Sequence, residues 1–155
     1  MVVICWRGRS RTREGGSNSP LWDMSADLVR KLKIEYPELR FVRGRKFAFR
    51  PPKTIVVGPS EEAEDLLLLH EVGHAILGHR DFKTDVGRLK MEMAAWEKAR
   101  ELTAVYGVKW DEEVAQGELD TYRDWLHQKS RCPVCGLTRF ETPDGQYHCP
   151  KCEEL

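Results

Sequence analysis

The most apolar stretch of this chain, "LLLLHEVGHAIL" at residues 66–77, is interrupted by His70, Glu71 and His74. Acidic residues precede the stretch and Ser60 stands in the position of an N-cap, so the pattern predicts a helix. A helix with this many leucines is suited to burial, and buried imidazole or carboxylate groups are costly unless they have partners. The pattern therefore indicates that His70, Glu71 and His74 have partners inside the folded protein.

Other patterns along the chain predict both helices and strands. Apolar positions with helical spacing predict helices over about 26–36, 85–106 and 111–129, and the interrupted stretch should end near Gly78. Three short segments rich in β-forming residues, "LRFVR", "KFAFR" and "TIVVG", are separated by glycine and proline. We therefore expect an α+β fold with a small antiparallel sheet ahead of the helix that carries the histidines.

Composition divides the 155 residues into three expected parts. Residues 1–20 are rich in Arg, Gly and Ser and are expected to form a flexible basic arm. Residues 21–129 contain all the predicted helices and long apolar segments, so they are expected to form the main domain. Residues 130–155 contain four of the five cysteines and are expected to form a small separate module.

Composition and charge narrow the classes of protein. A hydrophobic fraction of 41% and a charged fraction of 32% are typical of a soluble globular protein. No apolar run is long enough to span a bilayer, and the N-terminus does not read as a signal peptide, so a cytoplasmic protein without a membrane partner is expected. Residues 1–50 carry twelve Lys or Arg against five Asp or Glu, whereas the remainder carries thirteen against twenty. Attraction between the two halves is a simpler explanation of this asymmetry than a nucleic-acid partner.

The spacing of the two central histidines predicts a metal site. His70 and His74 are four residues apart, so on a helix they project from one face and can bind one ion. Glu71 is offset by about 100° of helical rotation, which places it beside the ion rather than on it. The resulting H-E-x-x-H string supplies two zinc ligands and a general base for a water molecule. We therefore expect a catalytic zinc ion, with Glu71 as the catalytic base.

A catalytic zinc ion usually takes a third protein ligand. His79 follows His74 by five residues and would point elsewhere on a continuous helix, and the metzincin pattern would need a histidine where this chain has Arg80. We expect His79 at the helix end, with contact through loop closure as the lesser alternative. Glu92 on the next predicted helix is the preferred third ligand, since two histidines and a glutamate form a common catalytic set. Glu97 is the competing candidate.

The string "HEVGHAILGH", followed by "EMAAW" on the next predicted helix, resembles the ImmA/IrrE-type zinc metallopeptidases of the gluzincin-like group. The resemblance covers about residues 55–106. It implies a zincin-like core, zinc-dependent hydrolysis of protein substrates such as repressors, and Glu92 as third ligand. The chain departs from many relatives in having Ala94 where they carry a second glutamate. By analogy with this fold type, "TIVVG" is expected to offer a sheet edge to an extended peptide.

The C-terminal cysteines predict a second metal site. They form a C-x2-C-x13-C-x2-C set, and "ETPDGQYHC" between the two pairs contains a turn signal for a hairpin. Four thiolates in two such pairs are typical of a closed structural zinc site, a zinc ribbon. A module this small cannot build a core, so the metal is expected to hold it folded. The four predicted ligands are Cys132, Cys135, Cys149 and Cys152.

These patterns together favour a zinc metalloendopeptidase with one catalytic and one structural zinc ion, acting on a protein or peptide. One alternative is a nucleic-acid-associated protease of the SprT type, which also joins H-E-x-x-H to a ribbon but usually has a third histidine ligand. The basic residues of the ribbon are Arg131, Arg139 and Lys151, among several acids, so nucleic-acid binding is not favoured. The other alternative is a non-catalytic zinc-binding scaffold or regulator.

Overall fold

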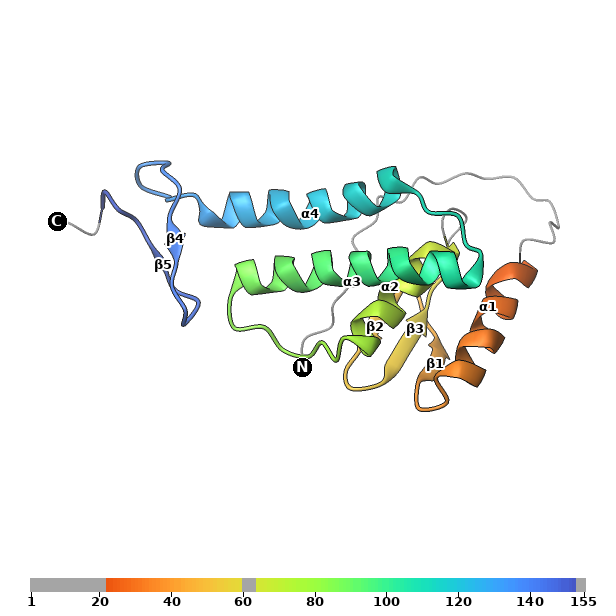
Figure 1. Ribbon diagram of the computed structural model, residues 1–155. Coiled ribbons are helices and arrows are strands. Elements are labelled where there is room, and N and C mark those ends of the chain that lie inside the picture. The colour runs from red at the N-terminus through yellow and green to blue at the C-terminus, as the bar shows by residue number, and fades with distance from the viewer. Residues whose placement is uncertain (1–21, 60–63, 153–155) are drawn as a thin grey trace. The chain divides into compact units, whose positions relative to one another are not determined.

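The computed structural model describes residues 22–59 and 64–152 (Figure 1). The expected arm at residues 1–20 and the expected cap Ser60 lie outside the described residues. Within them the chain forms four helices and five short strands, which confirms the α+β class. No helix in the described part of the chain is long and apolar enough to cross a membrane.

Three strands form a small sheet, β1 (Arg40–Arg43), β2 (Ala48–Arg50) and β3 (Thr54–Val57). Their order is β1-β3-β2, with β1 parallel to β3 and β2 antiparallel to it. The prediction of an antiparallel sheet is therefore wrong for one of the two pairings. Phe49 of β2 lies opposite Ile55 of β3, and both side chains are fully buried. The hairpin of β2 and β3 is local, whereas the partner of β1 is decided by packing.

Two helices cover this sheet and complete the core of the first unit. Helix α2 (Glu64–Ile76) packs against β2 and β3, and α1 (Trp22–Glu35) packs against α2 and β1. Each fully buried aliphatic or aromatic side chain contributes about 1.5–3 kcal/mol to the free energy of unfolding. The largest of them come from α1, β2, β3 and α2, namely Leu32, Phe49, Ile55, Leu66, Leu68, Leu69 and Val72.

Every residue of α2 from Leu66 to His74 is buried. This includes the two histidines and Glu71, as well as Gly73 between them. A helix buried on all sides has no solvent-facing side on which polar groups can be hydrated. Its polar residues must therefore be satisfied by groups inside the protein.

Helix α3 (Asp85–Tyr106) has the bounds that the sequence predicts, and it passes very close to α2. A Cβ atom added at Gly73 would lie 2.7 Å from the carbonyl oxygen of Ala95, which is itself fully buried. Glycine inside a helix lowers the stability of the helix by about 1 kcal/mol relative to alanine. Contact between the two backbones explains why glycine occupies this position.

Packing divides the chain into two compact units. The first contains the described residues up to Arg80 together with residues 95–111, and the second contains residues 81–94 and the described residues from Glu112 onward. The prediction of a separate module from residue 130 stays a prediction.

The second unit contains α4 (Glu112–Ser130) and the hairpin of β4 (Phe140–Glu141) and β5 (Tyr147–His148). The guanidinium of Arg88, in the first turns of α3, lies over three aromatic rings at 5.1 to 5.3 Å from their centroids. Such cation–π contacts, each worth about 0.5–2 kcal/mol, hold α3 against α4. The rings are those of Phe82, Tyr122 and Trp125.

We expect Gly73→Ala to lower the free energy of unfolding by about 1–3 kcal/mol, because the added methyl group must push the α2 and α3 backbones apart. Gly117→Ala is the matched control, since a Cβ at this position of α4 meets nothing within 4 Å. It should raise the free energy of unfolding by about 0.5–1 kcal/mol through helix propensity. Chemical denaturation at saturating zinc, followed by circular dichroism, measures both. Equal effects of the two substitutions would contradict the close contact.

Candidate metal centres

Helix α2 brings the two imidazoles of the H-E-x-x-H string together. The Nε2 atoms of His70 and His74 lie 3.2 Å apart, and the ring planes are perpendicular. His74 is fully buried and His70 is 6% exposed. The rings occupy one side of α2 because residues four apart lie one turn apart on the same face.

The distance between the two imidazoles fits one tetrahedral ion. Two nitrogen ligands at about 2.0–2.1 Å from zinc, at the tetrahedral angle, lie about 3.3–3.4 Å apart. The separation of 3.2 Å between the two Nε2 atoms is close to this value. An N–H···N hydrogen bond between the rings would have a similar length. Metal-binding stoichiometry separates these two explanations.

Helix α3 adds a carboxylate to the pair of histidines. Ligand atoms of His70, His74 and Glu92 all lie within 4.8 Å of one another, and Glu92 is fully buried. Glu92 is three residues before Ala95, on the same side of the helix that touches α2 at Gly73. Glu97 is exposed and lies outside the group. Of the two candidate glutamates, the fold therefore brings only Glu92 to the histidines.

Two aromatic rings cover the histidines. The indole of Trp96 stacks on the ring of His70, with centroids 4.2 Å apart and an angle of 27° between the planes. The ring of Phe49 lies nearly parallel to that of His74 at 6.2 Å. Trp96 follows Glu92 by four residues and so shares its helix face, a spacing that could have indicated its position beside the histidines. Phe49 comes from strand β2, and no spacing along the chain indicates its role.

His79 lies beside His74, although it is outside the three-residue group. The Nδ1 atoms of the two rings are 2.8 Å apart. The prediction that His79 points away from His74 is therefore wrong, and the alternative of contact through loop closure is the one observed. Glu71 is 4% exposed and follows His70 directly on α2. It is not part of the ligand group, as expected for a residue offset from the metal-facing side.

The four predicted cysteine ligands also come together. The Sγ atoms of Cys132 and Cys152 are 3.9 Å apart, and those of Cys135 and Cys149 are 3.5 Å apart. Thiolates at about 2.3 Å from a tetrahedral zinc ion lie about 3.8 Å from each other. A disulfide would hold them at about 2.0 Å. The separations therefore fit one metal ion held by four thiolates.

Local backbone geometry prepares the first cysteine pair for a metal. The N–H groups of Cys135 and Val134 lower the pKa of the Cys132 thiol to about 6, because they stabilise the thiolate by hydrogen bonding. Gly136 follows with a φ of 75°, and its N–H donates to the carbonyl of Cys132 at 2.9 Å. The left-handed turn at Gly136 therefore closes the loop around the thiolate.

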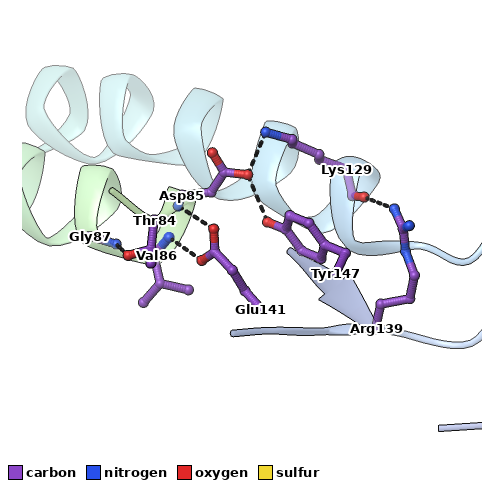
Figure 2. A network of polar contacts seen from close by, with 8 residues as sticks. All are labelled: Thr84, Asp85, Val86, Gly87, Lys129, Arg139, Glu141 and Tyr147. Atoms are coloured by element: carbon purple, nitrogen blue, oxygen red, sulfur yellow. Dashed lines mark hydrogen bonds and ion pairs between the residues drawn. The ribbon is translucent and has the colours of Figure 1, made fainter. Parts of the chain in front are cut away.

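The cysteine module is tied to the start of α3 (Figure 2). The Glu141 carboxylate accepts the backbone N–H groups of Asp85 and of Val86, the latter at 2.9 Å, and so caps the helix. Asp85 in turn accepts a hydrogen bond from the Tyr147 hydroxyl at 2.8 Å and forms an ion pair with Lys129. Burial and the bond to Asp85 raise the pKa of Tyr147, so its hydroxyl remains a donor.

Known protein families, curated proteins and solved structures were compared with this chain, and none of them matches it.

We expect the 155-residue chain to bind two zinc ions, one in each group. His70→Ala should bind one, because a single imidazole and a carboxylate hold zinc too weakly to retain it through dialysis. Cys149→Ser should lose the other, and Glu97→Ala should keep both. Inductively coupled plasma mass spectrometry on dialysed protein measures the stoichiometry. A wild-type protein that binds only one zinc ion would show that the histidine pair is a hydrogen-bonded structural contact, and two zinc ions in His70→Ala would show that His70 is not a required ligand.

We expect Glu141→Ala to lower the free energy of unfolding by about 1–2 kcal/mol, because it leaves two N–H groups at the start of α3 without their acceptor. Glu97→Ala, at an exposed position of the same helix, should change it by less than about 0.5 kcal/mol. Denaturation with both variants fully loaded with zinc isolates the cap from metal affinity. Equal stability of the two variants would contradict a capping role for Glu141.

Proposed function

We propose that this chain is a zinc-dependent endopeptidase with a zincin-like core, of the ImmA/IrrE type that its motif resembles, and with a C-terminal zinc ribbon. The single observation that carries the proposal is the convergence of His70, His74 and Glu92 within 4.8 Å. Glu71, the base expected from the motif, is buried directly beside the first of these ligands in sequence. A pair of histidines without a third ligand would fit several kinds of site. Two histidines with a glutamate form a ligand set that is typical of zinc hydrolases.

The three-residue group would hold the catalytic ion and leave a fourth position for water. When bound there, zinc supplies a water of lowered pKa and a Lewis acid for the scissile carbonyl. Glu71 accepts the proton of the attacking water at its carboxylate and delivers it to the leaving amine. Trp96 and Phe49 cover the imidazoles, which limits the access of bulk water to the ligands and strengthens their electrostatic interactions.

An extended peptide would need a sheet edge close to these ligands. The expectation that "TIVVG" offers this edge is wrong, because β3 is hydrogen-bonded on both sides, to β1 and to β2. Within the described residues β2 is an edge strand, and its Phe49 lies against His74. We therefore propose β2 as the strand on which the substrate backbone pairs. Pairing of this kind uses hydrogen bonds to the substrate backbone, so it would accept substrates of many different sequences.

The four-cysteine group is proposed as a structural zinc site. With four protein ligands it would leave no position for water, which is the arrangement of a closed site. Its hairpin is bound to the first turn of α3 through Glu141, and the same helix carries Glu92 two turns later. The ribbon therefore supports the helix that supplies the third catalytic ligand. This role needs no nucleic-acid partner.

We expect wild-type protein to cleave protein substrates and Glu71→Gln to lose at least 100-fold in kcat while still binding two zinc ions, because the amide cannot accept the proton of water. Glu97→Gln is the matched control and should retain full activity. Incubation of each zinc-loaded protein with a denatured proteome, followed by mass spectrometry of new peptide termini, detects the cleavage.

The outcomes of this screen separate the alternatives. A wild-type protein that binds two zinc ions and produces no termini beyond those of Glu71→Gln would be a scaffold, and the proposal would fail. Cleavage that requires added DNA would favour the SprT-type alternative. That alternative usually has a third histidine ligand, whereas in this chain the third member of the group is Glu92.

A further inference from the structure

The turn that ends α2 brings His79 back to the metal-binding side of that helix. The His79 N–H donates to the His74 carbonyl at 3.0 Å, and the Gly78 N–H donates to the Ala75 carbonyl at 3.1 Å. Gly78 has a φ of 66°. These two bonds and the left-handed glycine form a Schellman motif, which reverses the chain direction at the helix end. His79 therefore lies beside His74 instead of about 1.4 turns further along the helix.

The reversed chain sets the two imidazoles in direct contact. The Nδ1 atom of His79 is 2.8 Å from the Nδ1 atom of His74, and the ring centroids are 4.9 Å apart with an angle of 70° between the planes. A distance of 2.8 Å between two ring nitrogens requires one of them to carry a hydrogen and the other a lone pair. The contact thus requires that the two facing nitrogens share a single hydrogen, which one ring donates and the other accepts.

The other nitrogen of His74 decides which ring is the donor. His74 Nε2 faces His70 Nε2 at 3.2 Å, and both residues belong to the group with Glu92. A neutral imidazole that offers the Nε2 lone pair to a metal carries its hydrogen on Nδ1. That hydrogen points to Nδ1 of His79, which must then accept it and carry its own hydrogen on Nε2. The opposite assignment would place a hydrogen on His74 Nε2 and block metal binding.

We propose that His79 is a positioning residue of the catalytic metal centre, which accepts a hydrogen bond from His74 Nδ1 and so holds the Nε2 lone pair of His74 toward the metal. The inference rests on the proposed zinc site but not on peptide hydrolysis. Hydrogen bonds to the second nitrogen of a ligating histidine orient the ring and increase its basicity, and their loss usually weakens metal binding by about 10- to 100-fold. Such partners are commonly carboxylates or carbonyl groups, and here the partner is a third imidazole.

The test uses two substitutions that differ in one property. His79→Phe keeps an aromatic ring of similar size and removes the acceptor, whereas His79→Asn places its Oδ1 close to the position of Nδ1 and keeps an acceptor. His127→Phe is the control, because His127 is exposed on α4. Zinc affinity is measured on the full chain by competition with a chromogenic chelator. Cobalt spectra then separate the two sites, since thiolate-to-metal charge transfer arises only from the four-cysteine group.

We expect His79→Phe to weaken zinc binding at the histidine site by about 10- to 100-fold and to shift the ligand-field bands of cobalt at that site. His79→Asn should restore the affinity to within about threefold, and the charge-transfer bands of the cysteine site should be the same in all variants. Wild-type affinity in His79→Phe would overturn the inference and leave the zinc site intact. Failure of His79→Asn to restore affinity would also overturn it, because the role of His79 would then be packing. A wild-type protein that binds zinc only at the cysteines would overturn the inference and the proposed function together.

Discussion

Burial of helix α2 is the constraint on which the rest of this structure depends. Its residues from Leu66 to His74 are all removed from solvent, and two imidazoles and a carboxylate are buried with the leucines. Groups of this kind are stable in an apolar interior only when partners lie within bonding distance. The neighbouring elements surround these groups: α3 places Glu92 within 4.8 Å of the two histidines, and aromatic rings of α3 and β2 lie against the imidazoles. The absence of a side chain at Gly73 lets α3 come close enough to do so.

The two metal-ligand groups are built in different ways. The cysteine group comes from two short knuckles, in which backbone N–H groups and a left-handed glycine shape the loop around the thiolates. The histidine group joins residues from two helices and depends on how closely these helices approach. The capping of α3 by Glu141 connects them, because it fixes the first turn of the helix that carries Glu92. The hairpin that carries Glu141 therefore supports the first turn of α3.

The local sequence pattern predicted where helices and strands lie along the chain better than it predicted which strands pair with each other. The bounds of α3 and the positions of the three sheet strands follow from periodicity and from the flanking glycine and proline residues. The parallel pairing of Phe41 with Ile55 does not, because strand propensity says nothing about which strands become neighbours. That choice depends on how the apolar faces of the strands meet α1 and α2. The error in sheet type and the error about the edge strand share this cause.

The sequence by itself determined the chemistry of both groups, because the spacings of H-E-x-x-H and C-x2-C act within one helical turn or one loop. It thereby identified His70 and His74 and the four cysteines as the residues to be brought together. Only the tertiary structure decided between Glu92 and Glu97, since helix packing selects the face of α3 that is buried. The contact between His79 and His74 was likewise decided by the tertiary structure. The prediction from helical spacing assumed that the helix continues to His79, whereas the left-handed turn at Gly78 reverses the direction of the chain.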